Sequence, residues 1–203
     1  KQNAKVVDVE RKPKKSFSPG LYDLTELQRD ANKIFGYSAK ETLNIMQKLY
    51  ESHKVLTYPR TDSRYLSSDI VSTLPERLKA CGVGEYRSLA NKVLTKPIKV
   101  NKSFVDDSKV SDHHAIIPTE EYVNFANFND KERKIYDLVV KRFLAVLFPA
   151  HEFEQLTVHA KIGNEKFIAR GKTVITAGWK EVYSNRFDDE ETNEDVKEQL
   201  LPP

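Results

Sequence analysis

Apolar positions recur at helical spacing along most of the chain between residues 22 and 148. In the first such run, Leu24, Leu27, Ala31 and Ile34 are three or four residues apart, which places them on one helix face. Gly36 follows and can adopt the left-handed conformation that ends many helices. The pattern therefore predicts a helix that begins near Leu24 and stops at Gly36.

A second helix is predicted over residues 39–52. Ser38 and Glu41 have the spacing of a capping box, in which each residue satisfies a backbone amide at the helix start. The apolar side chains that recur on one face of this helix are predicted to belong to the core: Leu43, Met46, Leu49 and Tyr50.

Further helices are predicted up to residue 148. The segment 68–80 is helical in pattern with a break at Pro75, where Thr73 would cap a new helix, and a short helix follows over 85–94. Asp130 opens a long helix that ends at Pro149. Its inward positions are Ile135, Leu138, Val139, Val146 and Leu147.

Strand patterns flank this helical region. Residues 4–11 alternate apolar and charged side chains, and a linker rich in proline and lysine is expected over 12–20. After Pro149, strands are predicted over 153–162, 166–170 and 173–176, with a tight turn at Gly163 and Asn164. We expect residues 4–11 to join the later strands in one antiparallel sheet.

These elements give an α+β fold, in which a mainly helical domain is inserted in a small antiparallel β-domain. The expected divisions are a strand and linker over 1–15, the helical domain over 16–148, the remainder of the β-domain over 149–184 and an acidic linker over 185–203. The last segment is predicted to be a mobile connection.

Composition limits the class of protein. The 203 residues are 39% apolar, which is enough for a core, and no run reaches the roughly 20 apolar residues of a membrane span. The N-terminal residues lack an apolar signal core, so we expect a soluble protein of the cytoplasm without a membrane partner. The single cysteine, Cys81, excludes an intrachain disulfide and a cysteine-based zinc site, and is expected to be a small core residue in a reducing compartment.

The charge is unevenly distributed. The net charge is +3, but residues 186–203 carry two basic and seven acidic residues, so residues 1–185 carry a net +8. Such an excess favours a polyanionic partner such as nucleic acid, although scattered lysines also form ordinary solvated surfaces. A chain that begins with Lys1 and ends in two prolines is expected to be part of a longer protein.

One stretch, Leu56-Thr-Tyr-Pro-Arg-Thr-Asp-Ser63, concentrates reactive groups. A tyrosine has a pKa of about 10, so a nucleophilic tyrosine needs nearby cations to stabilise its phenolate. Arg60 is two residues from Tyr58, which places both side chains on one side of an extended segment. Asp62 could orient Arg60, and Thr61 and Ser63 could donate to phosphates. The alternative is packing plus a surface ion pair.

A second stretch, Lys109-Val-Ser-Asp-His-His-Ala-Ile-Ile-Pro-Thr119, brings an acid next to two histidines. A histidine can donate to a phosphate oxygen or relay a proton, and an aspartate can orient its ring. Two other interpretations stay open for His113 and His114: loop histidines that cap a strand, or, with Asp112, a weak metal site.

Together the two stretches resemble those of the type IA DNA topoisomerases, and the resemblance extends from residue 4 to about 184. Leu21-Tyr-Asp-Leu-Thr-Glu-Leu-Gln-Arg-Asp-Ala-Asn32 and Ala169-Arg-Gly-Lys172, with Trp179 after it, also resemble that family. The family's helical gate domain opens for strand passage, and its helices resemble a winged-helix DNA-binding unit. A strand at 55–58 after the helix at 39–52 would fit that unit.

The resemblance implies that Tyr58 attacks single-stranded DNA to form a transient 5′-phosphotyrosine, which is religated without ATP. It implies that Arg60 stabilises the transition state and that His113 contacts the scissile region. His114, Asp112, Asp62, Thr61 and Ser63 are expected in supporting roles. Gln47 and Arg64 are expected as DNA contacts, with solvent exposure as the alternative for Gln47, and Tyr65 is expected to be structural.

The resemblance also indicates what the chain lacks. Type IA enzymes use Mg²⁺ bound by an acidic Toprim domain that faces the tyrosine, and no matching acidic motif occurs in this sequence. We therefore expect no metal site here, a Toprim partner elsewhere in the parent protein, and no DNA relaxation by this chain alone. Two other hypotheses are a non-catalytic module that binds single-stranded DNA and a helical domain that binds acidic proteins.

Overall fold

The computed structural model describes residues 4–184, and these form two units. The first joins the residues up to Ser18 with those from Pro149 onward, and the second spans Pro19–Phe148, compared with the expected 16–148. Strands occur in the first unit and helices in the second, so the α+β class and the insertion of the helical part are confirmed. The predicted acidic linker lies outside the described residues.

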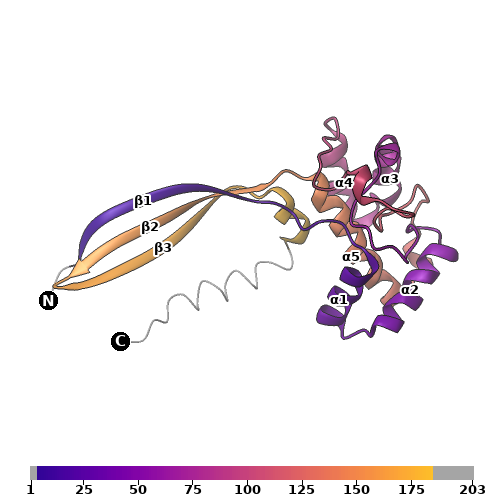
Figure 1. Cartoon of the computed structure of the whole chain (residues 1–203), viewed down its shortest axis with the longest axis horizontal. Coiled ribbons are helices and arrows are strands. Elements are labelled where there is room, and N and C mark those ends of the chain that lie inside the picture. Colours follow the sequence, from indigo (N-terminus) through magenta and orange to yellow (C-terminus); the bar gives the residue numbers. More distant parts are fainter. Residues whose placement is uncertain (1–3, 185–203) are drawn as a thin grey trace. The chain divides into compact units, whose positions relative to one another are not determined.

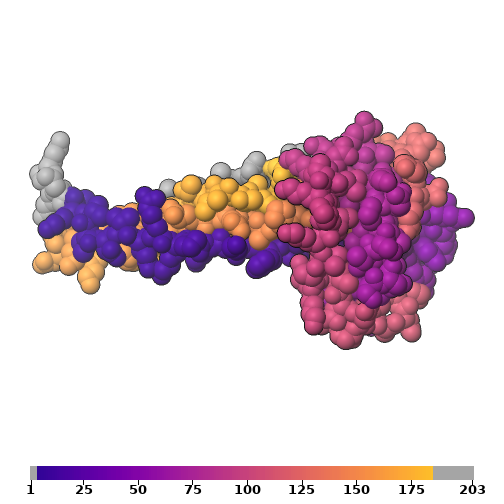
Figure 2. All heavy atoms as spheres, turned by 90° about the horizontal axis from the view of Figure 1, so that it is seen from above, coloured from indigo at the N-terminus to yellow at the C-terminus, as the bar shows by residue number. Residues whose placement is uncertain are grey.

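The sheet of the first unit has three antiparallel strands in the order β1-β2-β3, and they run side by side along their length (Figure 1). They are β1 (Lys5–Ser16), β2 (His151–Ile162) and β3 (Glu165–Thr176), with the predicted turn at Gly163 and Asn164. The pairing of β1 with β2 confirms that the N-terminal strand joins the later ones. Side chains of β1 and β3 are exposed at the surface (Figure 2), whereas those of β2 are mostly half-buried.

Two boundaries in the sheet differ from the prediction. Residues 12–16, expected as linker, continue β1, because Pro13 lies in an edge strand and Lys15 pairs with Glu152 at 2.7 Å across the ladder. The two predicted strands 166–170 and 173–176 form the single strand β3, because Gly171 keeps its pairing with Leu156.

The helical unit follows the predicted order. Asp23 caps α1 (Leu24–Phe35), which ends at Gly36 with φ +72°, a conformation that other residues adopt only with strain. Ser38 caps α2 (Ala39–Glu51) by accepting from the Glu41 amide. The remaining helices are η1 (Ser68–Thr73), α3 (Leu74–Cys81), η2 (Gly84–Tyr86), α4 (Arg87–Leu94), η3 (Asp107–Lys109), η4 (Phe125–Asn127) and α5 (Asp130–Leu147); η5 (Gly178–Tyr183) belongs to the first unit.

The core of this unit is centred on α5, against which α1, α2 and α4 pack (Figure 1). Ile135, Leu138 and Val139 are buried as predicted, whereas Val146 and Leu147 near the helix end are only half-buried. Cys81 is buried, as expected for a small core residue, and burial raises the pKa of its thiol to about 12.

Three details of the helical unit differ from the prediction. Thr73 makes no cap bond at α3; its hydroxyl donates to the Ile70 carbonyl at 2.7 Å instead. Tyr50, predicted in the core, is 37% exposed. The strand expected at 55–58 is a single bridge between Leu56 and Pro118, so the winged-helix likeness stays a prediction. Among residues 4–184, no helix is long and apolar enough to cross a bilayer.

Candidate active site

Side chains from Tyr58 to Arg64 alternate between two sides of the chain. One set faces outward, with Tyr58 and Arg64 half-buried and Arg60 and Asp62 exposed. The other set is buried: Pro59, Thr61 and Ser63. A period of two is that of an extended backbone, so Tyr58 and Arg60 lie on the same, outward side, as the sequence predicted.

Hydroxyl groups connect this segment to the loop 109–117. Thr61 donates to the His113 carbonyl at 3.0 Å, and Ser63 donates to the Lys109 carbonyl at 2.8 Å. Thr57 accepts from the Ile117 amide at 3.0 Å. Since these hydroxyls are committed to the backbone, Thr61 and Ser63 fit the supporting role expected of them and not the alternative role of phosphate donors.

The base of the loop is fixed from a third segment. The Ile116 amide donates to the Tyr22 carbonyl at 2.8 Å, and the Leu24 amide donates to the Thr61 carbonyl at 3.1 Å. Arg142 of α5 in turn donates to the Gly20 carbonyl at 3.0 Å. The long helix α5 therefore anchors the segment that holds both halves of the site.

The Tyr58 ring lies between two other rings. His113 approaches it with a centroid separation of 4.2 Å and an interplanar angle of 33°, and Tyr50 approaches edge to face at 5.5 Å and 82°. In the described part of the chain, no hydrogen bond restrains the Tyr58 hydroxyl. The phenol is therefore held by ring contacts, with its oxygen available to a ligand.

Arg60 is exposed, and within residues 4–184 its guanidinium has no hydrogen bond or ion pair. The expected orientation of Arg60 by Asp62 is not observed, because no ion pair joins these two exposed side chains in the described chain. An unpaired guanidinium next to an accessible phenol can receive phosphate oxygens without breaking an internal contact.

The two adjacent histidines have different surroundings. His113 is exposed and contacts Tyr58, whereas His114 is half-buried with its Nδ1 2.7 Å from the Ala115 carbonyl. Burial lowers the pKa of His114, so its ring is neutral and donates from Nδ1 to that carbonyl at neutral pH. Asp112 is exposed beside them.

The remaining predicted residues lie at the edge of the site. Arg64 donates from Nε to the Leu21 carbonyl at 3.1 Å, which fits support of the scaffold more than a DNA contact. Gln47 is half-buried on α2, three residues before Tyr50 and so on a neighbouring part of the helix surface. Lys109 donates to the Tyr65 hydroxyl at 3.1 Å, in keeping with a structural Tyr65.

Sequence reasoning missed two members of the site. Tyr50 was assigned to the core because it follows Leu49 in an apolar run, but the buried face of α2 is centred on Ile45, Met46 and Leu49, and Tyr50 lies at its rim. Thr57 was not singled out. Thr57 precedes Tyr58 in a segment whose side chains alternate between two sides. The sequence could therefore have indicated that Thr57 points to the side opposite Tyr58.

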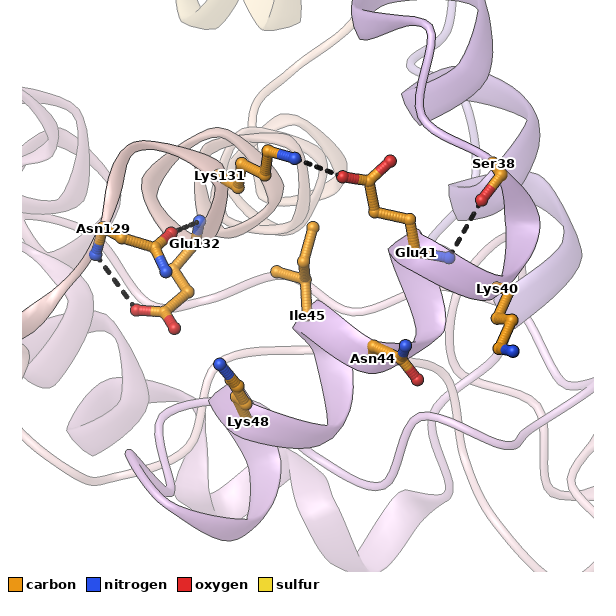
Figure 3. Close-up of a pocket in the computed structure, with 9 residues that line it drawn as sticks. All are labelled: Ser38, Lys40, Glu41, Asn44, Ile45, Lys48, Asn129, Lys131 and Glu132. Carbon is orange, nitrogen blue, oxygen red and sulfur yellow. Dashed lines mark hydrogen bonds and ion pairs between the residues drawn. The ribbon is translucent and has the colours of Figure 1, made fainter.

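A metal ion does not fit the described residues. Nowhere in residues 4–184 do three or more histidine, cysteine or carboxylate side chains form a group that could hold one, which counts against the metal-site interpretation of Asp112, His113 and His114. A separate open hollow of about 320 Å³ lies between α2 and the start of α5 (Figure 3). Its lysines and glutamates, which include the Lys131–Glu41 pair, contribute no side chain to the Tyr58 site.

Comparison with known proteins connects this geometry to one family. The family model described as "DNA topoisomerase" matches residues 1–201. The chain is 82% identical over 202 residues to DNA topoisomerase 3 of Bacillus cereus, covering 100% of this chain and 28% of that protein. It is 57% identical over 201 residues to DNA topoisomerase 3 of Bacillus subtilis, covering 99% of this chain and 28% of that protein.

The fold is also similar to a solved structure, the full-length topoisomerase I of Thermotoga maritima. The TM-score is 0.66 at 24% sequence identity, over 90% of this chain and 30% of the other. The chain thus spans less than a third of the length of the relatives that it matches. It belongs to the type IA DNA topoisomerase family, as a segment similar to part of the bacterial topoisomerase 3 proteins.

Proposed function

We propose that this chain carries the nucleophile with which a type IA DNA topoisomerase cuts and rejoins single-stranded DNA. The Tyr58 phenol loses its proton, and its oxygen attacks a backbone phosphorus. The bond from phosphorus to the 3′ oxygen breaks, and that oxygen takes up a proton, leaving a 5′-phosphotyrosine. Attack by the same 3′ hydroxyl reverses the step. The ester conserves the bond energy, so strand passage and religation need no ATP.

Arg60 and His113 have separate roles in this proposal. The Arg60 guanidinium binds nonbridging phosphate oxygens and stabilises the charge that grows on them in the transition state. His113 lies against the Tyr58 ring, and in this proposal it donates to the scissile phosphate. His114, Thr61 and Ser63 hold the loop and the tyrosine segment together and do not touch DNA.

The observation that carries the proposal is the state of Tyr58. Its ring is packed at 4.2 Å against His113, it is only half-buried, and no described residue binds its hydroxyl. Tyr86 differs in both respects: it is buried and donates to Asp137 at 2.8 Å. A phenol that is held in place while its oxygen is left unpaired has the arrangement that a nucleophile needs.

The proposal assigns the metal ion to another part of the full-length protein. Mg²⁺ would supply charge stabilisation at the phosphate, and the described residues hold no group that could bind it. We infer that a Toprim domain of the parent protein brings the metal to the Tyr58 side of the gate. We also place the enzyme in the cytoplasm, where its DNA substrate is found.

The test is capture of the covalent intermediate by the full-length protein. A single-stranded oligonucleotide labelled at its 3′ end should transfer the label to the protein on denaturation, because the 5′-phosphate side stays on the tyrosine. The same oligonucleotide labelled at its 5′ end should give a shortened free product with a 3′ hydroxyl. Tyr58→Phe should abolish both products while DNA binding changes by less than about threefold.

The outcomes separate the proposal from its alternatives. Label transfer that survives in Tyr58→Phe would remove Tyr58 as the nucleophile. A full-length protein that binds single-stranded DNA but gives no covalent product under any metal condition would favour the non-catalytic binding module. Equal binding to DNA and to an acidic polypeptide would favour the helical domain that binds acidic proteins.

A further inference from the structure

The Tyr50 side chain is more exposed than the apolar pattern of its helix predicts. Tyr50 belongs to an amphipathic helix whose neighbouring Met46 and Leu49 are fully buried, but its own side chain is 37% exposed. Its ring instead meets the Tyr58 ring edge to face, with centroids 5.5 Å apart at 82°. An exposed aromatic residue on a packed helix, in contact with a candidate nucleophile, calls for a role other than core packing.

The backbone under Tyr50 is held firmly. The helix end is closed by bonds from the Ser52 and His53 amides to the Lys48 carbonyl, both at 3.0 Å, and from the Val55 amide to the Leu49 carbonyl at 3.0 Å. The His53 ring then bonds Glu132 of α5 at 3.2 Å. Tyr50 therefore projects from a helix end that is tied to the central helix of the unit.

The other ring beside Tyr58, that of His113, is carried by a loop and not by a helix. His113 comes from an exposed bend and is connected to the scaffold through its own carbonyl, which accepts from Thr61. Since the Tyr58 hydroxyl has no partner among the described residues, the two flanking rings are its main restraints. A side chain on a helix fixes geometry better than one on a loop.

We propose that Tyr50 is a positioning residue for the reaction: its ring packs against the Tyr58 ring and keeps the Tyr58 hydroxyl directed at the scissile phosphate. The inference rests on the proposed role of Tyr58 as nucleophile. The ring performs this function, and the Tyr50 hydroxyl is not needed. Tyr50 acts through Tyr58 and does not bind DNA.

The test measures the single-turnover rate of covalent complex formation by the full-length protein at saturating 3′-labelled oligonucleotide. Tyr50→Ala should lower that rate by roughly 10- to 100-fold, since a shift of about 1 Å in a reacting group can cost that much. Tyr50→Phe keeps the ring and should stay within about twofold of the unchanged protein. The dissociation constant for the oligonucleotide should change by less than about threefold in both.

Two further variants guard against a folding artefact. Tyr50→Leu keeps an apolar side chain of similar bulk without a ring, and its rate of covalent complex formation should also be low. If only Tyr50→Ala is slow and that variant is poorly folded, the loss comes from misfolding. Tyr122→Ala removes a tyrosine that is 69% exposed and that makes no ring contact with any residue of the described chain. This control should cleave at the unchanged rate.

Each contrary result has a distinct meaning. Unchanged rates in Tyr50→Ala and Tyr50→Leu would overturn the inference alone, provided that Tyr58→Phe still abolishes the covalent product. Weaker DNA binding with an unchanged saturated rate would make Tyr50 a base-stacking contact and overturn the positioning role. A Tyr50→Phe variant as slow as Tyr50→Ala would show that the hydroxyl is required. Covalent product in Tyr58→Phe would instead end the proposed function.

Discussion

Thr61 connects the two segments of the candidate site through one buried hydroxyl group. It donates to the His113 carbonyl at 3.0 Å and accepts from the Ser63 amide at 3.1 Å, with its side chain 6% exposed. The bond from the Ser63 amide is buried, so water does not readily replace that partner. The geometry of the candidate site therefore depends on a buried residue.

Thr61→Val should destabilise the helical unit by about 1–3 kcal/mol, because it leaves the buried Ser63 amide unsatisfied and removes the bond to the His113 carbonyl, while it preserves the shape of the side chain. Urea unfolding of the chain measures this free energy. Thr25→Val, at an exposed position of α1, is the matched control and should stay within about 0.5 kcal/mol. A Thr61→Val protein as stable as the control would contradict the bracing role.

His114 should make the stability depend on pH, in a direction that follows from the sign of its pKa shift. Burial lowers its pKa in the folded state, Arg77 lowers it further, and the Ala115 bond and Asp69 oppose the shift. The unfolded chain then binds the proton more readily, so the contribution of His114 is complete above the ordinary histidine pKa and declines as the pH falls through it.

Between about pH 7.5 and 5.5, the unchanged protein should therefore lose more unfolding free energy than His114→Gln does. Urea titrations at several pH values measure the two slopes. Parallel curves for the unchanged protein and His114→Gln would show that His114 does not make this contribution.

The local arrangement of Tyr58 and Arg60 was easier to predict from the sequence than their surroundings. The Tyr58 and Arg60 side was predictable because alternation follows from local backbone geometry alone. The ring of Tyr50 at Tyr58 and the hydroxyl of Thr61 at His113 join residues that are distant or on different elements. Such contacts depend on how the elements pack, which one sequence without its fold does not specify.

At the scale of elements, helix limits were predictable and strand limits were not. Caps and a glycine stop are local signals, and Ser38 and Gly36 act where they were expected. Strand β1 continues through Pro13 and a run of lysines that looked like a linker. Its extension depends on partners in β2, such as Glu152, which forms an ion pair with Lys15 at 2.7 Å, and these lie more than a hundred residues away.

The first unit, which contains the sheet and is called the β-unit below, needs a glycine at the turn that leads into η5. Gly178 has φ +57°, and a Cβ there would lie 2.3 Å from the Ala150 carbonyl oxygen, which is backbone and cannot turn aside. Gly178→Ala should therefore cost about 2–4 kcal/mol in the stability of the β-unit. The adjacent Trp179 is 7% exposed and is the only tryptophan, so its fluorescence during urea unfolding reports this region.

The control for this prediction lies in the same unit. Gly171 is in β3, and a Cβ there would approach the Leu156 Cβ at 3.9 Å, which is ordinary contact. Gly171→Ala should therefore change the unfolding midpoint little. Equal midpoints for the two alanine variants would show that the close approach at Gly178 is relieved by movement of the backbone.

At the scale of the molecule, the proposed nucleophile and the proposed metal ion belong to different parts of the full-length protein. The helical unit brings together Tyr58, Arg60 and His113, and residues 4–184 offer no group that could bind a metal ion. The relatives are more than three times as long, at 28% coverage. Transition-state charge on a phosphate needs more compensation than one guanidinium gives, so the site should be complete only in the full-length protein.

We therefore expect the 203-residue chain in Mg²⁺ to leave negatively supercoiled plasmid unrelaxed and to give no covalent product with a 3′-labelled oligonucleotide. The full-length protein should do both, and should lose relaxation when the metal is chelated. We expect the short chain to fold but not to perform the reaction, so its thermal transition should be cooperative under the same conditions. The contrary result would be relaxation by the short chain that is lost in its Tyr58→Phe variant. It would show that the phosphate is activated without a second domain. Residues of this chain, such as Arg60 and His113, would then stabilise the transition-state charge by themselves.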